Sequence, residues 1–466
     1  MHILAIFGEL AQQLGVPVPR GVTVGTLDEL AGQQDALRYP VVMKPARSIG
    51  SRGSGASHLQ VSYAFDAAGL VAGCGHALRF GHVVLQEYFS GEGVGIELIA
   101  NQGEIRYAFQ HRRLHEVPLT GGGSSLRESE ALNERLLDAS ARLMRALGWH
   151  GVAMVEFKLD RDSGEFCLME INGRFWGSLP LAVAAGADFP AMLLEMELKG
   201  DVGDWALYRE GIYCRLLSRD LMWYEAVLRG GGDNRLVALP SRRENIRHLA
   251  LLFHPRHRLD VQSLSDPRPG VVDIARILRK YVERLQSLLE QRRFQAKQRR
   301  AWRRGEVAEK LAQADSMLFL CYGNINRSAL ADVMVRGYAQ DAGVEVCSAG
   351  FHEEENRPAD PVMVEIAADS GVDLGASRSR IVSREMLDDS GIIFVMEKSH
   401  YDRLLSMCPD LADKVFLLGA HPTEGLQGAE IDDPFGLSRE AYVVCYARIT
   451  QAIDHIKGMI ALRSNF

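Results

Sequence analysis

The segment from Met317 to Ser328, MLFLCYGNINRS, constrains the fold of this chain more than any other stretch. Four apolar residues, with the composition of a buried strand, run directly into Cys321. Gly323 and Asn324 follow, and both residue types adopt the left-handed conformation that a tight turn requires. Arg327 closes the loop, with five residues between it and the thiol. The pattern predicts a strand that ends in a tight, positively charged loop.

The residues after this loop predict a helix that begins at Ser328 and continues through residues 329–338. Such a helix directs its unpaired N-terminal amides and the positive end of its dipole at the loop. Those amides, Arg327 and the Ser328 hydroxyl would all stabilise a thiolate at Cys321. We therefore expect a nucleophilic sulfur that faces a cradle for an oxyanion.

The spacing of Cys321 and Arg327 is weak evidence alone, because the chain has 7 Cys and 53 Lys plus Arg. A buried structural cysteine is the alternative. Asp433 strengthens the case, since Pro434 fixes this carboxylate in a predicted turn about a hundred residues later. A cysteine that attacks a phosphate monoester needs an acid to protonate the leaving oxygen. The same carboxylate can then deprotonate the water that breaks the cysteinyl phosphate.

Together with the sequence Ser348-Ala-Gly350 after a predicted strand at 344–347, these motifs resemble the low-molecular-weight protein tyrosine phosphatase family. The resemblance extends over residues 316–460 and implies a domain built on a small doubly wound parallel sheet. It also implies that this domain acts on a phosphotyrosine protein. It implies roles for five residues: Cys321 as nucleophile, Arg327 as phosphate binder, Asp433 as general acid, and Asn324 and Ser328 as residues that shape the loop.

Asn326 departs from that family, because many members carry a second cysteine there that protects the nucleophile as a disulfide. The related arsenate reductases use the same loop and pass the oxidation on to two further cysteines. The later thiols of this chain, Cys347, Cys408 and Cys445, are not paired at short spacing. We therefore expect phosphate ester hydrolysis, with arsenate reductase as the alternative for this domain.

The overall composition, with 47% hydrophobic and 24% charged residues over 466 positions, is that of a globular protein of about three domains. No apolar run approaches the roughly 18 residues of a membrane span, and the N-terminal residues lack the pattern of a signal peptide. Seven scattered cysteines indicate reduced thiols rather than a disulfide framework. We expect a cytoplasmic protein without a membrane span.

Positive charge concentrates between Arg276 and Lys310, where 12 Lys plus Arg against four Glu give +8 in a chain of net charge −7. Apolar residues at spacings of three and four predict that this segment starts as an amphipathic helix. We interpret residues 274–315 as a basic helical linker between domains. Binding of nucleic acid or anionic lipid is the less favoured alternative.

Residues 151–172 predict a β-hairpin, because two strand-like runs flank the turn-forming sequence RDSG. If the turn is centred near Ser163, Glu156 and Glu170 oppose one another, and a cation between them is the simplest explanation for two facing carboxylates. Asn172 shares the face of Glu170, and a set of oxygen ligands favours Mg²⁺ over zinc. The alternative is a shifted register in which both glutamates face solvent.

Lys44 ends a short predicted strand and precedes a loop rich in Gly and Ser at 48–55, a combination suited to nucleotide phosphates. A second predicted strand ends in the triplet Gln86-Glu87-Tyr88. With the hairpin carboxylates, these features resemble the ATP-grasp superfamily of carboxylate-amine ligases over residues 1–270. The resemblance implies an ATP site made by Lys44, Gln86, Glu87, Tyr88 and Arg174, with Mg²⁺ held by Glu156, Glu170 and Asn172.

The chemistry of that superfamily is phosphorylation of a carboxylate by MgATP to an acyl phosphate, which an amine then attacks. Arg112, Arg113 and the glycine-rich loop 120–125 are weak candidates for holding the acceptor. The superfamily usually has a preceding α/β domain, so the resemblance implies two α+β subdomains with an incomplete N-terminal domain.

The sequence thus predicts an α/β chain with an ATP-grasp domain at 1–273, the linker at 274–315 and a phosphatase domain at 316–466. We expect a bifunctional enzyme that acts on a phosphotyrosine protein and on small carboxylate and amine substrates. The alternative is a phosphatase regulated by a non-catalytic ATP-binding module. The intact metal-binding carboxylates favour catalysis.

Overall fold

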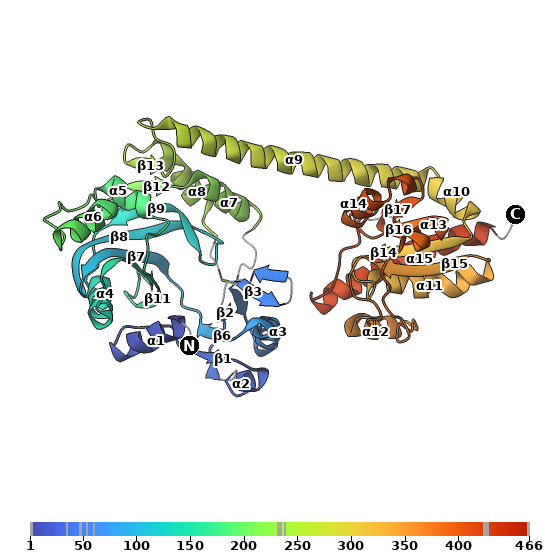
Figure 1. Cartoon of the computed structure of the whole chain (residues 1–466), viewed down its shortest axis with the longest axis horizontal. Coiled ribbons are helices and arrows are strands. Elements are labelled where there is room, and N and C mark those ends of the chain that lie inside the picture. The colour runs from blue at the N-terminus through green and yellow to red at the C-terminus, as the bar shows by residue number, and fades with distance from the viewer. Residues whose placement is uncertain are drawn as a thin grey trace. The chain divides into compact units, whose positions relative to one another are not determined.

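The computed structural model of the chain describes residues 3–33, 36–45, 49–52, 55–58, 61–230, 235–236, 239–422 and 428–463. The chain divides into two compact units, Met1–Ile277 and Leu278–Phe466, and the division falls inside the helix α9 (Pro267–Arg303). Each unit has its own sheets (Figure 1). Hydrophobic clusters of the described residues also fall within one unit or the other. Of the predicted loop 48–55, Ser48 and residues 53–54 lie outside the described residues.

The first unit is built on two larger sheets and a two-stranded ribbon. A four-stranded antiparallel sheet has the order β1-β6-β2-β5, a seven-stranded sheet has the order β11-β10-β7-β8-β9-β12-β13, and β3 pairs with β4. The strands are β1 (Gly21–Val24), β2 (Val41–Pro45), β3 (Ile49–Arg52), β4 (Gly55–His58), β5 (Ser62–Ala64), β6 (Val83–Glu87), β7 (Glu92–Asn101), β8 (Glu104–Val117), β9 (Gly123–Glu130), β10 (Gly151–Leu159), β11 (Phe166–Asn172), β12 (Tyr213–Arg215) and β13 (His257–Leu259). The helices are α1 (Ile3–Gln13), α2 (Leu27–Ala31), α3 (Ala67–Ala77), α4 (Glu134–Leu147), α5 (Leu179–Ala185), α6 (Phe189–Lys199), α7 (Leu217–Leu228) and α8 (Arg242–Ala250).

Alternation along the strands gives the seven-stranded sheet two apolar faces. Ile96 and Leu98 of β7 pack in one core with α4, whereas Ile99 packs in another with α5 and α6. The helix α4 has clear end signals, since the side chain of Asn133 accepts hydrogen bonds at its start and Gly148 ends it in the left-handed conformation. Val155 of β10 and Ile171 of β11 pack in the same core as α4, so the hairpin lies against this helix layer.

The hairpin β10–β11 has the predicted pairing of carboxylates. Glu156 lies directly opposite Glu170, and a β-bulge follows, since Phe157 pairs with Leu168 and Met169 is left over. The turn alone would set a register one residue different at this point, so the bulge brings the two glutamates into opposition.

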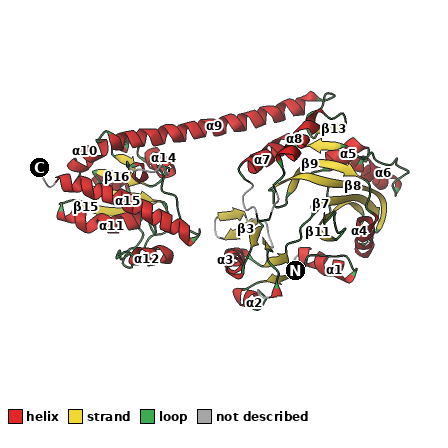
Figure 2. Cartoon of the chain, turned by 180° about the vertical axis from the view of Figure 1, so that it is seen from behind, coloured by secondary structure: helices red, strands yellow, loops and turns green. Residues whose placement is uncertain are grey.

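The second unit is built on a four-stranded parallel sheet of order β15-β14-β16-β17. Figure 2 shows strands of this sheet, among them β15 and β16, surrounded by helices. Because β15 and β16 lie on opposite sides of β14, right-handed crossovers place helices on both faces. The predicted doubly wound fold is confirmed. Its strands are β14 (Ser316–Cys321), β15 (Glu345–Gly350), β16 (Ile392–Val395) and β17 (Val415–Leu417). Its helices after α9 are α10 (Glu306–Gln313), α11 (Arg327–Asp341), α12 (Pro361–Ala368), α13 (Arg384–Asp389), α14 (Lys398–Met407) and α15 (Arg439–Arg463).

The end of α9 and the helix α10, both within the predicted linker, join the core of the second unit. Trp302, Val307 and Leu311 are buried there, and the Trp302 indole donates a 3.0 Å hydrogen bond to the Leu417 carbonyl. The C-terminal part of the segment predicted as a linker therefore belongs to the core of the second unit. The domain boundaries at 273 and 315 stay predictions.

Within the described ranges, no single helix is long and apolar enough to cross a membrane. The pair α5 and α6 reaches the required length and hydropathy only when taken together, and it bends by 83° at the break.

Candidate active sites

The sulfur of Cys321 lies at the end of β14 inside the predicted loop. It accepts a 3.1 Å hydrogen bond from the Asn324 amide and lies 3.0 Å from the Ser328 hydroxyl oxygen. Cys321 is 2% exposed. In this loop the Cys321 sulfur therefore contacts a backbone N–H and a hydroxyl group, and both kinds of group can stabilise a thiolate.

Asn324 holds the loop in shape. It takes the left-handed conformation with φ of 52°, and its side chain links two segments. The carboxamide oxygen accepts from the Arg380 amide at 2.8 Å, while its nitrogen donates to the Ser328 hydroxyl at 2.9 Å. Gly350, at the end of β15, lies directly behind, because a Cβ there would come within 2.7 Å of the Tyr322 carbonyl oxygen.

The helix after the loop begins one residue earlier than predicted. α11 starts at Arg327, so Ser328 is its second residue, and the flanking Asn326 does not cap it through its side chain. Asn326 is 2% exposed, and neither polar atom of its side chain has a hydrogen-bond partner within the described residues. Arg327 is thus the first residue of α11, and its side chain points back toward the loop, as is usual for side chains in the first turn of a helix.

Arg327 joins the loop to Asp433. Its guanidinium contacts the Asp433 carboxylate at 2.6 Å, donates to the Ile431 carbonyl at 2.9 Å and pairs with Glu397. Burial acts to raise the pKa of the Glu397 carboxyl, but the charge and hydrogen bond of Arg327, together with His400 and Ser399, lower this pKa overall. The structure thus brings all five predicted residues of this site together.

The sequence interpretation missed Glu397. This residue follows β16 by two positions, at the same carboxyl edge of the parallel sheet as Cys321. Since functional groups of such sheets gather at that edge, a carboxylate there was the available signal.

In the first unit, all eight predicted ATP and metal residues line one cavity of about 540 Å³. They are Lys44, Gln86, Glu87, Tyr88, Glu156, Glu170, Asn172 and Arg174. The triplet Gln86-Glu87-Tyr88 at the end of β6 also has structural contacts, since the Glu87 amide donates to the Arg20 carbonyl and the Tyr88 amide to the Pro40 carbonyl. These bonds fix the strand end at the cavity wall.

The opposed glutamates fit a magnesium ion by their chemistry. Burial, and then the charge of Glu156, raise the pKa of Glu170 above its ordinary value of 4.5, as expected for two carboxylates that face one another. The amide nitrogen of Asn172 donates to Glu156 at 3.0 Å, which places a third oxygen-bearing group beside the pair. Within the described residues no three His, Cys, Asp or Glu side chains cluster as a metal site, so the candidate site depends on an amide ligand.

Arg113 already contacts one of the two glutamates. Its guanidinium lies 2.5 Å from Glu156 and 3.2 Å from Glu116. A metal held by Glu156 therefore has to share this carboxylate with Arg113. Arg112, the other predicted acceptor residue, pairs instead with Glu128 at 2.7 Å and does not line the cavity.

Arg219 is a cavity residue that the sequence interpretation missed. Its guanidinium crosses Gly123, where a Cβ would lie 1.6 Å from a guanidinium nitrogen. It makes no ion pair or hydrogen bond in the described part of the chain. A glycine-rich turn and an arginine without a carboxylate partner thus meet at one side of the cavity.

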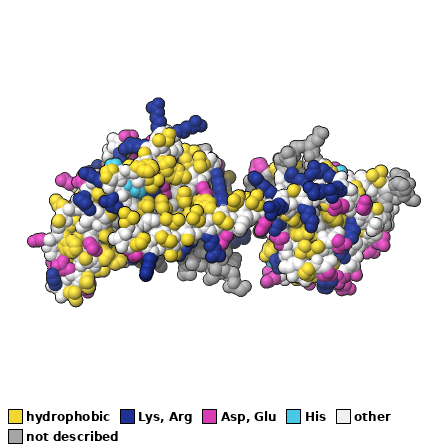
Figure 3. Space-filling model, turned by 90° about the horizontal axis from the view of Figure 1, so that it is seen from above, with side chains coloured by type: hydrophobic (Ala, Val, Ile, Leu, Met, Phe, Trp, Pro, Cys, Tyr) yellow, Lys and Arg dark blue, Asp and Glu magenta, His cyan; other side chains and the backbone are white. Residues whose placement is uncertain are grey.

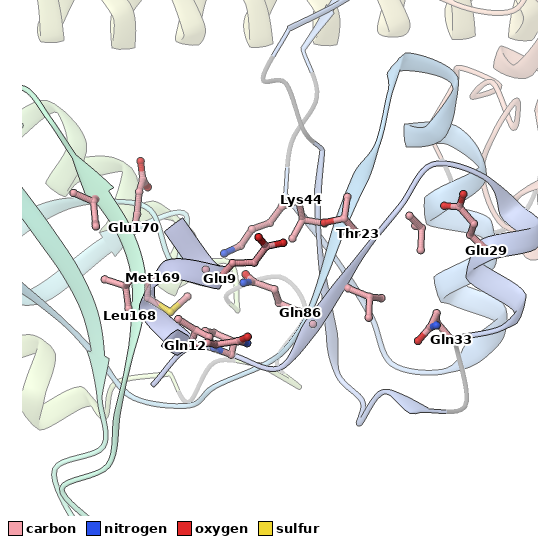
Figure 4. Close-up of a pocket in the computed structure, with 18 of the residues that line it drawn as sticks. Glu9, Gln12, Thr23, Glu29, Gln33, Lys44, Gln86, Leu168, Met169 and Glu170 are labelled. Carbon is pink, nitrogen blue, oxygen red and sulfur yellow. The ribbon is translucent and has the colours of Figure 1, made fainter. Parts of the chain in front are cut away.

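A second cavity of about 800 Å³ adjoins the first and is walled by α1, β1, α2 and β11 (Figure 4). The two share Lys44 and Glu170, and Figure 4 shows Lys44 extending toward the side where Glu170 lies. Burial lowers the pKa of Lys44 below its ordinary 10.5, against the charges of Glu170 and Glu156. The smaller cavity also holds Glu156, Asn172 and Arg174, so it contains every residue that the sequence predicts for nucleotide and metal binding.

A pH experiment tests the environment of Glu170. The folded chain holds this proton more tightly than the unfolded chain, so ionisation of Glu170 destabilises the ligand-free protein as pH rises above 4.5. Glu170→Gln should raise the thermal midpoint of the first unit at pH 8 in a chelator and leave it unchanged at pH 4. An equal change at both pH values would contradict a raised pKa.

A parallel sheet whose central strand delivers a cysteine to an arginine-bearing loop, with an aspartate across from it, defines the low-molecular-weight class of tyrosine phosphatases. Residues 316–463 match the family model described as low molecular weight phosphotyrosine protein phosphatase. Residues 79–218 match a model described as ATP-grasp in the biosynthetic pathway with Ter operon. The chain therefore belongs to the low-molecular-weight phosphotyrosine protein phosphatase family through its second unit and carries an ATP-grasp module in its first.

Three curated relatives illustrate the extent of the match. The low molecular weight protein-tyrosine-phosphatase Wzb of Escherichia coli (strain K12) is 33% identical over 138 residues, which are 30% of this chain and 90% of Wzb. The phosphatase Etp of the same strain is 32% identical over 138 residues, 30% of this chain and 89% of Etp. The probable phosphatase EpsP of Ralstonia solanacearum is 30% identical over 139 residues, 30% of this chain and 91% of EpsP. These relatives do not favour the arsenate reductase alternative.

Proposed function

We propose that the chain is a bifunctional enzyme: a tyrosine phosphatase that works through a cysteinyl phosphate, and an ATP-dependent ligase that activates a carboxylate. The phosphatase proposal rests on the contact of Arg327 with Asp433 beside the Cys321 sulfur, which the loop amide of Asn324 contacts. The opposed Glu156 and Glu170 in a cavity with Lys44 support the ligase proposal.

The phosphatase residues divide the reaction into two steps. The Cys321 sulfur attacks phosphorus while Arg327 and the loop amides bind the non-bridging oxygens, and the P–O bond to the leaving group breaks. Asp433 gives its proton to the leaving oxygen. It then takes a proton from water, whose oxygen attacks phosphorus and releases the thiolate and phosphate. When the substrate phosphate binds the Arg327 guanidinium, it replaces Asp433 as the partner of this arginine. Asp433 is then available for these proton transfers.

Asp433→Asn is expected to slow turnover of an aryl phosphate by about 10²–10⁴-fold, the usual contribution of a positioned acid. The loss should be largest for phenyl phosphate, a poor leaving group, and smaller for p-nitrophenyl phosphate, because a good leaving group departs without a proton. Steady-state kcat/KM for both substrates measures this, because it reports the step in which the leaving group departs. An equal loss for both would remove Asp433 from the role of acid, and Asp432→Asn is the matched control beside it.

The ATP-grasp residues would bind and orient the nucleotide and its metal. Glu156, Glu170 and Asn172 would hold Mg²⁺, and Lys44 and Arg174 would bind phosphate oxygens. Bound MgATP supplies the γ-phosphoryl group to the substrate carboxylate. The Arg219 guanidinium over the turn at Gly121–Gly123 is suited to bind an anionic group of the acceptor, because Arg113 is engaged by glutamates.

ADP release by the purified full chain, measured across a panel of carboxylates and amines, tests the ligase proposal. A carboxylate-dependent release that disappears with Glu170→Gln supports it. Persistent silence, with MgATP still bound, would instead support the alternative of a phosphatase with an ATP-sensing module.

A further inference from the structure

The first half of α9 carries an apolar stripe on its solvent side. Five aliphatic residues and Tyr281 follow one another at spacings of three and four, which is the a/d pattern of a coiled-coil seam. The five are exposed to between 45% and 64%: Val271 64%, Ile274 45%, Leu278 61%, Leu285 57% and Leu288 49%. We call these six residues the α9 seam. Val282, 52% exposed, and Leu289, 42% exposed, widen it along one flank.

One face of the second half of the same helix is buried against the chain itself. Trp302 is 5% exposed, and Gln298 is 4% exposed and accepts a 3.0 Å hydrogen bond from the Leu417 amide. Figure 3 shows hydrophobic side chains along the first part of the helix, with Lys and Arg in their place along the second. The α9 seam therefore ends where the helix packs on its own unit, and its exposure is particular to the first half.

We propose that the α9 seam binds the α9 seam of a second copy of the chain in an antiparallel pair. Its spacing is self-complementary, since antiparallel packing sets a positions against d positions. Val271 then faces Leu288 of the second copy, Ile274 faces Leu285, and Leu278 faces Tyr281.

The area and the charge of the helix both favour this occupant. The half-exposed side chains of the α9 seam, with Val282 and Leu289, would bury roughly 600–700 Å² of accessible surface on each copy. The pair would then bury about 1,200–1,400 Å² in total, which is within the range of stable interfaces. The segment 292–304 holds seven Lys or Arg and no acidic residue. A parallel pair would bring two such segments together, whereas the antiparallel pair separates them by more than about 30 Å, well beyond the screening length of about 8 Å.

Sedimentation velocity of the full chain at micromolar concentration tests the association. The wild-type chain should sediment as a dimer of about twice 51.6 kDa. The double variant Leu278→Asp/Leu285→Asp should be a monomer with unchanged helix content by circular dichroism and unchanged p-nitrophenyl phosphate hydrolysis. The control Gln286→Asp/Ser287→Asp adds the same charges on the other side of α9 and should stay dimeric. A monomeric wild type, or a dimeric seam variant, would overturn the proposal.

Cysteine cross-linking then tests the direction of the pair. Val271→Cys and Leu288→Cys chains should give no cross-link above the wild-type background when each is oxidised alone, because like positions lie about 25 Å apart in an antiparallel pair. A mixture of the two should give a covalent dimer. Efficient cross-linking of Val271→Cys alone would overturn the antiparallel arrangement. The wild-type lane controls for the native thiols, of which Cys347 is half-buried and the other six are buried.

Discussion

Replacing Cys321 with Ser is expected to lower hydrolysis of p-nitrophenyl phosphate and of phosphotyrosine peptides by at least about 10⁴-fold. The loop amide of Asn324 and the Ser328 hydroxyl contact the sulfur directly. A hydroxyl in its place would remain un-ionised and nucleophilically weak at neutral pH, while the rest of the phosphate cradle stays intact. Initial rates at saturating substrate measure the effect.

Cys445→Ser is the matched control for that variant. Cys445 is also buried in the second unit, and burial raises the pKa of its thiol to about 12, so it is a poor nucleophile. Its replacement should leave turnover within a few-fold of wild type. Phosphatase activity that survives in Cys321→Ser and is lost in Cys445→Ser would place the chemistry elsewhere.

The second large effect is expected at the metal carboxylates. MgATP at about a hundred times its dissociation constant should stabilise the first unit by about 2.7 kcal/mol, a rise of roughly 5–10 °C in its thermal midpoint. The variant Glu156→Gln/Glu170→Gln should lose most of that rise, because it removes both charges that would hold Mg²⁺ in a cavity that also contains Lys44. Differential scanning fluorimetry with and without MgATP measures this.

Two carboxylates on the same sheet give the control. Glu128 and Glu130 of β9 pair with Arg112 and line neither cavity. Glu128→Gln/Glu130→Gln can change the midpoint of the ligand-free protein, but the rise with MgATP should remain. If the rise persists in Glu156→Gln/Glu170→Gln, these glutamates do not hold the metal.

The sequence predicted what depends on local pattern. The strand before Cys321, the left-handed residue at Asn324 and the sulfur-to-hydroxyl contact follow from apolar periodicity, conformational preference and helix polarity, and the structure has all three. The opposition of Glu156 and Glu170 was also predicted, but the symmetric turn was only part of the reason. The bulge at Met169 completes the register, and no local signal marks a bulge of this kind.

The remaining features depend on contacts between segments far apart in the chain. Glu397 pairs with Arg327 across 70 positions, and Arg113 reaches Glu156 across 43. Trp302 looked like part of a solvated basic linker because its neighbours are arginines, yet its ring is buried against the second unit. Tertiary packing determines both ion pairs and the burial of Trp302. The charge pattern of the sequence does not show which face of α9 packs against the rest of the chain.

Mass spectrometry of a trapped phosphoenzyme tests the central claim most directly. Asp433→Ala, incubated briefly with p-nitrophenyl phosphate and quenched in acid, should carry one phosphoryl group on the peptide that contains Cys321, because loss of the base slows hydrolysis of the intermediate more than its formation with this leaving group. The same peptide from Asp433→Ala/Cys321→Ser should be unmodified. A phosphoryl group on another residue, or equal labelling in both variants, would contradict catalysis through a cysteinyl phosphate at Cys321.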